Sequence, residues 1–320
     1  SGLTLKSDYG NIGNEKYQFE YKNYTSYDES TKKNVSISEM AGNIPPWLEQ
    51  KTNKNSDGTY KRIYYENTTM KKVIIANDIE FLYPLNWFYE CQNLESVGGN
   101  GKIDFAKADD MSKIFYNCRN LTDISEMKIE NTYNVINMNS MFYGNSKLED
   151  IGSITRWDTS RVNDMGYLFC NIPITDISAL SSWNTSNVTT MNYMLSNTQI
   201  TNAKALSNWD VSKVKDMGDM LSNTQISDLS PLANWDISNV ESLSGTFYNT
   251  KITNVNALSN WNTSNVCNFQ SIFGVCTALG DAKGLENRNM SSATNIKSMF
   301  TRCYVLGNFN LNNWDVSNVE

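Results

Sequence analysis

The chain has 320 residues, 40% of them hydrophobic and 19% charged, and its 27 basic and 34 acidic side chains give a net charge of -7. This acidic balance disfavours nucleic acid and anionic membrane surfaces as partners, because both are bound through clustered Lys and Arg. The chain contains no histidine, which excludes Ser-His and Cys-His pairs and His-ligated zinc. No phosphate-binding loop and no apolar run near the ~20 residues of a membrane span is present. We therefore expect no enzyme, no cofactor, no resident metal and no membrane insertion.

Residues 1–72 form the first predicted unit, a β-rich region with no internal repeat. Tyr17, Phe19 and Tyr21 alternate with polar residues, and residues 60–65 are rich in β-formers. We predict an N-terminal cap that covers the open edge of the first repeat. Its many tyrosines fit a half-buried edge strand better than a recognition surface.

Residues 73–320 carry a repeat that tryptophan reveals. Five tryptophans, each 26 residues from the next, head the same Trp-x-x-Ser phrase. Glu130 and Arg288 hold the tryptophan position in two other units, where we expect the aromatic stacking to be interrupted. A buried stacked ladder explains the tryptophans better than a carbohydrate platform, because they recur at the structural period. The ladder comprises Trp157, Trp183, Trp209, Trp235 and Trp261, and the repeat marks fall at 76, 103, 130, 157, 183, 209, 235, 261, 288 and 314.

Each repeat is predicted to contain one helical turn and one short strand. The serine of the phrase, as in Ser186, precedes apolar residues at the spacing of a short helical turn, and we expect it to be the N-cap. The other half of the unit, as in residues 174–177 and 200–203, has the apolar spacing of a leucine-rich-repeat strand. Stacked neighbours would bury the apolar face of each unit, which predicts a solenoid with a continuous core.

The repeat phrases resemble a known family. WDVSKVKDM at residues 209–217 and WFYECQNL at residues 87–94 look like the repeats of BspA-like leucine-rich-repeat bacterial surface proteins, including mycoplasma lipoprotein-type repeats. The resemblance covers about residues 73–320. It implies an α/β repeat fold, namely a right-handed leucine-rich-repeat solenoid of about nine 26–27-residue units behind the N-terminal β-rich cap.

Four of the six cysteines share one position in the repeat, three residues after the aromatic residue that ends the predicted helical turn. Asn145 and several threonines hold this position in other units. A ladder of buried free thiols explains the pattern best, although neighbouring coils are close enough for disulfides. Cys170 and Cys267 lie elsewhere and are expected to be packing residues. The shared position holds Cys91, Cys118, Cys276 and Cys303.

A column of Asp and Asn follows the predicted strands and is the candidate ligand-binding site. We expect an Asx stripe along the concave face of the solenoid, with carboxylates close enough to bind Ca²⁺ or a polar ligand. The alternative is a ladder in which each side chain satisfies backbone amides and needs no ion. The stripe comprises Asp123, Asp150, Asp176, Asn202, Asp228, Asn254, Asp281 and Asn308.

The resemblance implies recognition at a bacterial cell surface or in secreted form. The expected function is that of an adhesin, which binds a host or bacterial surface protein or glycan through the solenoid surface. The alternative is a structural spacer that holds another domain away from the cell. A binder should show columns that break the repeat on one exposed face, and we expect this variation before residue 157 and after residue 261. The chain stops inside a repeat at 314–320, so we expect a fragment without its signal peptide and anchor.

Overall fold

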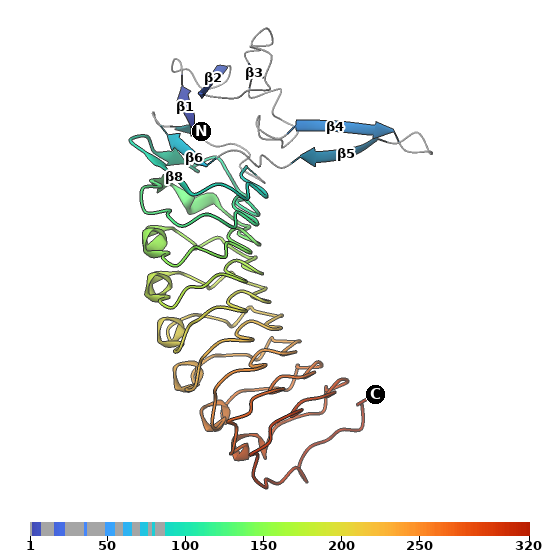
Figure 1. Ribbon diagram of the computed structural model, residues 1–320. Coiled ribbons are helices and arrows are strands. Elements are labelled where there is room, and N and C mark those ends of the chain that lie inside the picture. Colours follow the sequence, from blue (N-terminus) through green and yellow to red (C-terminus); the bar gives the residue numbers. More distant parts are fainter. Residues whose placement is uncertain are drawn as a thin grey trace.

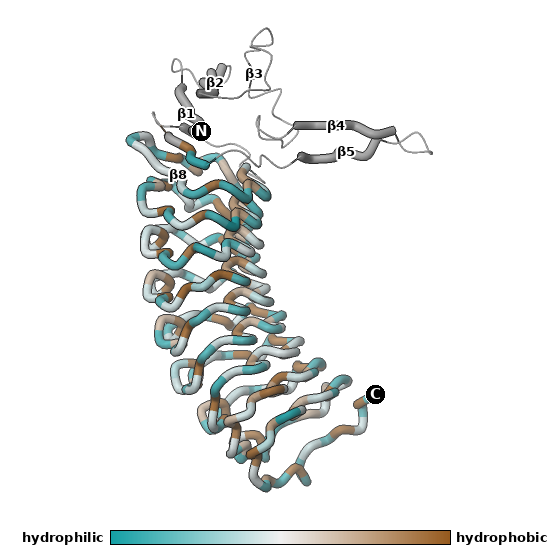
Figure 2. Tube along the Cα trace, viewed as in Figure 1, coloured by the Kyte–Doolittle hydropathy of each residue, from teal (hydrophilic) through white to brown (hydrophobic). Residues whose placement is uncertain are grey.

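A computed structural model describes residues 2–7, 16–22, 35–36, 49–54, 60–65, 71–75, 79–80 and 87–320. From residue 87 onward the chain winds into coils that stack on one another, and the stack bends along its length (Figure 1). Apolar and polar positions recur in register from coil to coil (Figure 2). The predicted repeat architecture is therefore confirmed. In these described ranges no helix is long and apolar enough to cross a membrane.

The N-terminal strands join the sheet of the first coils. Strand β1 (Gly2–Ser7) pairs antiparallel with β2 (Lys16–Lys22) and parallel with β6 (Lys72–Ile75). Strand β6 in turn pairs parallel with β8 (Ser96–Gly99), and β3 (Val35–Ser36) pairs with the far edge of β2. The order is thus β3-β2-β1-β6-β8. This sheet connects strands from the region predicted as a cap to the start of the repeats.

Two smaller sheets complete the strand inventory of the described residues. Strands β4 (Glu49–Lys54) and β5 (Tyr60–Tyr65) form an antiparallel pair. Strands β7 (Ile79–Glu80), β9 (Ile103–Asp104) and β10 (Ile129–Glu130) form a parallel sheet in which β9 is central. Each pairing in the second sheet joins residues about one repeat apart.

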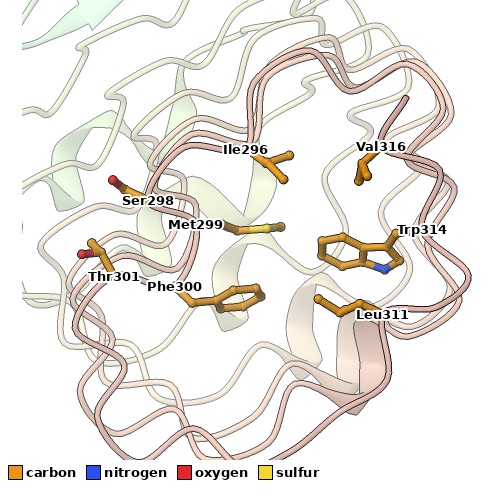
Figure 3. A pocket seen from close by; sticks show the side chains of 8 residues that line it. All are labelled: Ile296, Ser298, Met299, Phe300, Thr301, Leu311, Trp314 and Val316. Carbon is orange, nitrogen blue, oxygen red and sulfur yellow. The ribbon is translucent and has the colours of Figure 1, made fainter. Parts of the chain in front are cut away.

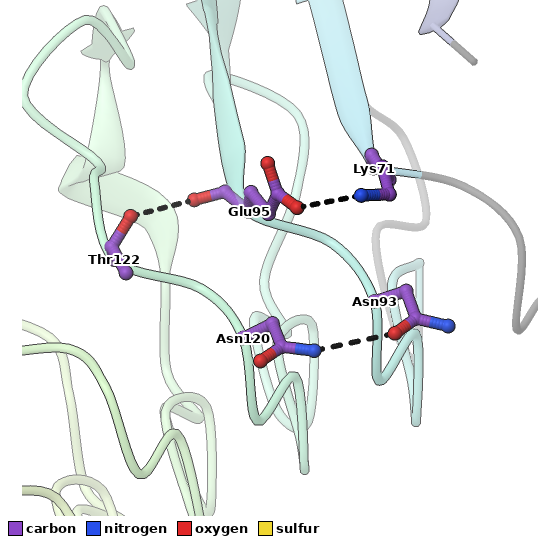
Figure 4. Close-up of polar contacts among 5 residues, drawn as sticks. All are labelled: Lys71, Asn93, Glu95, Asn120 and Thr122. Carbon is purple, nitrogen blue, oxygen red and sulfur yellow. Dashed lines mark hydrogen bonds and ion pairs between the residues drawn. The ribbon is translucent and has the colours of Figure 1, made fainter.

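Polar side chains bridge the first coils along one edge. Lys71 and Glu95 form an ion pair at 3.2 Å, and the Thr122 hydroxyl donates to the backbone carbonyl of Glu95 at 3.2 Å (Figure 4). Asn120 Nδ2 donates to Asn93 Oδ1 at 3.3 Å in the same view. Each contact lies between successive coils, so equivalent positions are held side by side.

A run of tandem β-turns supplies the main ladder between coils. The Met165 amide donates to the Thr190 carbonyl at 3.1 Å and the Tyr167 amide to the Asn192 carbonyl at 2.8 Å, both in the next coil. The Leu168 amide, which follows that of Tyr167, donates back to the Met165 carbonyl of its own coil at 3.4 Å. Successive amides therefore alternate between donating to the next coil and donating within their own coil, and this pattern repeats along the array.

This backbone geometry requires left-handed residues at fixed places. The third residue of a type II turn has positive φ, which Gly and Asn adopt at the lowest cost. The asparagine amide side chains can also bond one another, as Asn249 Nδ2 does to Asn223 Oδ1 at 2.9 Å. One such position holds Asn117, Gly144, Asn171, Asn197, Asn223 and Asn249, with φ between 53° and 74°.

Helices in the described residues are all of the 3₁₀ type, and they form one row along the outer side of the bend (Figure 1). They lie in the half of each unit that the sequence predicted to be a strand. Residues 174–177, for example, lead directly into η4, and the Ile174 carbonyl accepts the Gln199 amide of the next coil at 2.9 Å. The helices are η2 (Thr132–Asn134), η3 (Gly152–Arg156), η4 (Ser178–Ser182), η5 (Lys204–Leu206), η6 (Ser230–Leu232), η7 (Asn256–Leu258) and η8 (Lys283–Leu285).

The helical turn was thus predicted in the wrong half of the repeat, whereas parallel pairing between coils occurs in both halves, as the bridges of Ser96 with Asp123 and of Asn254 with Asp281 show for the predicted strand half. The Trp-x-x-Ser phrase leads into isolated parallel bridges such as Asp164 with Thr190 and Thr190 with Asp216. Its serine is not an N-cap, because Asp210 Oδ1 accepts both the amide and the hydroxyl of Ser212, at 3.0 and 2.6 Å. Apolar residues at every third position fit tandem turns as well as a helical turn, and such short segments are ambiguous by periodicity.

The core is one continuous cluster that runs the length of the array. Phenylalanine rings stack in register, with centroids 5.5 Å apart for Phe115 and Phe142 and 5.9 Å apart for Phe142 and Phe169. Methionines such as Met165 and Met191 are completely buried beside them. Because each coil covers the apolar face of its neighbour, burial of this face depends on stacking.

The five repeat tryptophans are 4 to 7% exposed, and four of them, from Trp183 to Trp261, donate hydrogen bonds to the preceding coil. The Trp209 indole donates to the Leu180 carbonyl at 3.0 Å, and its successors in the column donate to the equivalent carbonyls. The rings of Trp157 and Trp183 stack at 6.4 Å. Ring burial and a satisfied N–H together explain why tryptophan recurs at this position.

The two units that lack tryptophan behave differently. Arg288 is buried, and its guanidinium donates to the carbonyls of Leu258 and Trp261 and, at 3.0 Å, of Gly284. The Leu258 carbonyl is the one that an indole would reach from this position, so the arginine replaces the donor although the aromatic ring is lost. Glu130 is instead exposed and pairs with Lys102 at 2.9 Å.

We predict that Arg288→Ala lowers the free energy of unfolding by about 2–4 kcal/mol, because it leaves a cavity and removes donors from buried carbonyls. Arg288→Trp should keep a donor and restore the ring, with a thermal midpoint at least equal to that of the parent chain. Exposed Arg302 gives the control, and Arg302→Ala should change stability by less than about 0.5 kcal/mol. Thermal and urea unfolding measure both. Equal effects of the two alanine substitutions would contradict this account of Arg288.

Candidate functional site

The Asx stripe predicted from the sequence lies at the starts of the 3₁₀ helices. Asp176 Oδ1 accepts the Ser178 amide at 2.7 Å, and Asp228 Oδ1 accepts the Ser230 amide at 2.8 Å. The same bond to the residue two positions later is made by Asp123, Asp150, Asn202, Asn254 and Asp281, while Asn308 is exposed. Because these helices line the outer side of the bend (Figure 1), the expected position on the concave face is wrong.

The stripe has the contacts of a hydrogen-bonded ladder. Bonds from Ser125 and Ser230 lower the pKa of Asp123 and Asp228, and the Lys283 amide lowers that of Asp281. These groups therefore remain ionised with their own backbone as partner. Within the described part of the chain, no three His, Cys, Asp or Glu residues are grouped so that they could hold a metal ion.

The cysteine column lies in the core, and none of the six cysteines, all within the described residues, forms a disulfide. The Cys118 thiol donates to the Phe88 carbonyl at 2.9 Å and the Cys276 thiol to the Phe247 carbonyl at 3.0 Å. Burial raises the pKa of Cys118 well above its usual value and that of Cys303 to about 11. Thiols in this state are poor nucleophiles.

Asn145 occupies the same column but differs from its neighbours. Its side chain is completely buried, and neither its nitrogen nor its oxygen has a hydrogen-bond partner. In later coils Thr198 and Thr224 donate to the carbonyl three residues earlier, each at 2.8 Å. The column thus places polar side chains inside an apolar core. Small hydroxyl side chains find hydrogen-bond acceptors there, whereas the Asn145 amide does not.

A cavity of about 420 Å³ lies against the C-terminal coil (Figure 3). Its wall is mostly apolar, and Trp314 faces Met299 and Phe300 across it. In inner coils the equivalent phenylalanine is covered by the next coil, as Phe273 is by Phe300 at 5.8 Å. The cavity therefore exposes core-type surface. It is lined by Ile296, Ser298, Met299, Phe300, Thr301, Leu311, Trp314 and Val316.

The tandem turns carry a row of tyrosines that we call the tyrosine stripe, formed by Tyr89, Tyr116, Tyr143, Tyr167 and Tyr193. All five are partly exposed. Centroids are 4.9 Å apart for Tyr89 and Tyr116, 4.8 Å for Tyr116 and Tyr143, and 4.6 Å for Tyr167 and Tyr193. The stacking fixes the side chains across five coils, so little rotamer freedom remains to be lost on binding.

The stripe changes column between its third and fourth rings. The position of Tyr143 is held in the next coil by buried Cys170, and Tyr167, from three residues earlier, contacts the Tyr143 ring at 6.2 Å edge to face. Buried serines continue the first column, and Ser196 and Ser222 share a hydrogen bond at 2.7 Å. Small side chains in one column thus leave space for tyrosine in the other.

Tyr167 and Tyr193 adopt backbone conformations that bulky residues rarely take. Their φ angles are 57° and 56°, and that of Asp219, next in the column, is 53°. Such angles cost a non-glycine residue free energy and concentrate at functional sites. Gly245 follows Asp219, and a Cβ at this glycine would lie 2.3 Å from Asp219 Oδ1. Positive φ is a property of this column as a whole, since Lys113, Ser140, Ser271 and Ser298 share it, and Gly245 leaves space for the Asp219 carboxylate.

Asp219 ends the stripe as a half-buried carboxylate. Burial raises its pKa and nearby Asp216 raises it further, while hydrogen bonds from Tyr193 and Ser222 act in the opposite direction. Burial and the same Asp219 carboxylate raise the pKa of Tyr193, so its hydroxyl remains a donor. In the part of the chain that the structure describes, no Lys or Arg forms an ion pair with Asp219.

This surface was not predicted from the sequence. The sequence prediction concerned the tyrosines of the N-terminal region, whose side chains lie outside the described residues. A signal was nonetheless present, because Tyr89, Tyr116 and Tyr143 are spaced by 27 residues and Tyr167 and Tyr193 by 26. Applying the tryptophan period to every aromatic residue would have found the stripe, although not its change of column.

A comparison with models of protein families shows to which family the chain belongs. The model of the family described as "Mycoplasma protein of unknown function, DUF285" matches residues 85–173, 149–226, 168–256 and 222–320. The chain belongs to the DUF285 family. BspA-like repeats are related to this family, so the resemblance of the repeat phrases is supported at that level. No curated protein matches the chain. Membership in DUF285 establishes tandem repeats and assigns no activity.

We predict that Asp228→Ala lowers the free energy of unfolding by about 0.5–2 kcal/mol, because the Ser230 amide loses its acceptor. Asp228→Asn keeps the oxygen and should leave stability nearly unchanged. Adding Ca²⁺ should not move the thermal midpoint of the parent chain. A rise with Ca²⁺ that Asp228→Asn removes would favour the ion site over the hydrogen-bonded ladder.

We also predict that Asp219→Asn is at least as stable as the parent chain at neutral pH. The pKa of Asp219 is raised by folding, so its ionised form disfavours the folded state. Its contribution to stability falls as pH rises from the unfolded pKa through the folded one. The advantage of the asparagine variant should therefore shrink toward acidic pH. Urea unfolding of both proteins across pH 4–8 measures this, and a variant that is less stable at pH 7 would contradict it.

Proposed function

We propose that the chain is a recognition protein that binds a protein or glycan of a host or neighbouring cell through the face of its tandem turns. The single observation that carries the proposal is the tyrosine stripe, five stacked and partly exposed rings on successive coils. The binding mode is complementarity over an extended rigid surface, without chemical conversion of the ligand.

The chemistry of this face supports binding. Stacked tyrosines offer ring edges and hydroxyls, which make apolar and polar contacts at low entropic cost. Around them the tandem turns present small residues that are partly exposed, as in Asn171 and Gly144. Antibody paratopes use the same combination of rigid tyrosines and small adaptable residues.

The variation between coils also favours a binder over a spacer. The Asx stripe on the outer side keeps Asp or Asn at every coil and the same backbone bond at nearly all. The position of Tyr116 instead changes from coil to coil, and the change occurs in the middle of the array as well as toward its ends. A spacer would have no reason to vary one face and conserve the other. The residues at this position are Tyr89, Tyr116, Tyr143, Cys170, Ser196, Ser222, Tyr248, Gly274 and Thr301.

The proposal includes a finer assignment of the fold and location. The array would be a right-handed leucine-rich-repeat solenoid, exposed on the cell surface or secreted. The 26–27-residue period, the parallel bridges between successive coils and the relation to BspA-like repeats support this assignment. Its ladder side is built from tandem turns rather than from the regular strands of the sequence prediction.

We predict that replacing Tyr116 and Tyr143 together by Ser weakens binding at least about tenfold, because anchor side chains contribute 1 kcal/mol or more each. The folded chain is first screened against purified extracellular-matrix proteins and glycans, and the variant is then titrated against whatever binds. Tyr133, on helix η2 and 46% exposed, gives the matched control Tyr133→Ser, which should bind as the parent chain does.

Two controls keep this test decisive. Tyr116→Phe retains the stacked ring, so it separates loss of a hydroxyl from loss of fold, and thermal midpoints are recorded for all variants. Binding that survives the double substitution would move the site away from the stripe. A folded chain that binds nothing in the panel would favour the spacer.

A further inference from the structure

We propose that Asp219 receives a lysine or arginine side chain of a protein partner at the C-terminal end of the tyrosine stripe. This inference rests on the proposed function and specifies the chemistry of the partner. Asp219 is the point where the stack of rings gives way to a carboxylate, since the next positions of the column hold Asp219 and Gly245 rather than tyrosine.

Among the described residues, no Lys or Arg is a cause of the shifted pKa of Asp219. Its oxygens accept hydrogen bonds from the neutral hydroxyls of Tyr193 and Ser222, and the charged group that does influence it, Asp216, is also acidic. A half-buried carboxylate without a cation is unfavourable for the chain alone, and an incoming ammonium or guanidinium would relieve this cost. Hydrogen bonds to a charged partner are also stronger than neutral ones.

Aromatic groups beside the carboxylate favour an organic cation. Tyr193 stacks on Tyr167 at 4.6 Å on one side and reaches Asp219 through its hydroxyl. A side chain that pairs with Asp219 would therefore also lie against a tyrosine, where the aliphatic stem of Lys or the plane of Arg packs well. An alkaline-earth ion such as Ca²⁺ would gain nothing from the rings, and it needs more oxygen ligands than this site offers.

The length of the stripe favours a protein over a small free cation. Its five tyrosines span successive coils, so a partner that also reaches Asp219 must be extended and must carry its basic residue at one end of the contact. The acidic chain, with a net charge of -7, adds long-range attraction for a basic partner. The partner surface that fits is thus an extended polypeptide segment with apolar or aromatic residues followed by Lys or Arg.

The test uses a phage-displayed library of random 12-residue peptides selected on the immobilised full chain. Enriched peptides are expected to contain Lys or Arg and to bind Asp219→Asn at least about tenfold more weakly. Asp219→Asn preserves shape and keeps one of the two acceptor oxygens, so its thermal midpoint serves as the folding check. Asp228→Asn on the outer side is the matched control and should bind as the parent chain does. Affinity should also fall as salt is raised.

The outcomes separate this inference from the proposed function. Peptides that lose affinity for the Tyr116 and Tyr143 double-serine variant but not for Asp219→Asn would overturn the inference and leave the stripe as a binding surface. Enriched peptides without a basic residue would overturn it as well. Peptides that bind all variants equally, or a selection that enriches nothing, would contradict both.

Discussion

Alternation of the backbone amides between neighbouring coils is the constraint on which the rest of the structure depends. In the tandem turns one amide donates to the next coil and the following one to its own coil, as Tyr167 and Leu168 do. No regular strand is needed, because every second donor is satisfied by a neighbour at the same repeat position. The stacking that follows from these bonds places the tryptophans, phenylalanines and methionines in columns, where each coil covers the core of the one before.

The same constraint explains which substitutions the array accepts. Positions with positive φ favour Asn and Gly, which is why Asn recurs from Asn171 to Asn249. The tryptophan position of the repeat requires a side chain that fills core volume and donates a hydrogen bond. Arg288 is accepted there because its guanidinium donates to the Leu258 carbonyl. Glu130 has no such donor geometry, and it lies on the surface beside Lys102. The need for a hydrogen-bond donor, and not aromaticity alone, therefore determines which residues can be buried in this column.

The outer side and the tandem-turn side of the array differ in how strongly local hydrogen bonds to the backbone restrict their side chains. On the outer side seven of the eight Asp and Asn residues bond the amide two residues later, and six of these begin a 3₁₀ helix, so their identity is restricted by local structure. On the tandem-turn side, side chains such as Asp164 and Asp216 also accept an amide two residues later, but most amides donate to backbone carbonyls and leave other side-chain positions free to vary. Tyr167, Tyr193 and Asp219 use that freedom at strained positions. The proposed recognition function and the proposed cation contact at Asp219 both follow from this difference.

The sequence by itself determined the repeat, its period and the identity of the core columns, because a spacing of 26 or 27 residues is unaffected by local conformation. It also indicated that the cysteines of one column share an environment, which the structure places in the core without disulfides. It placed the helical turn in the wrong half of the repeat, since apolar residues three apart suit a helical turn and tandem turns equally. Only the tertiary structure decided which face each polar column occupies. That choice depends on hydrogen bonds between coils, which put the Asx stripe on the outer side. They also bring the five tyrosines, which are 24 to 27 residues apart in the sequence, into one row of contacting rings that is edge to face between Tyr143 and Tyr167 and stacked elsewhere.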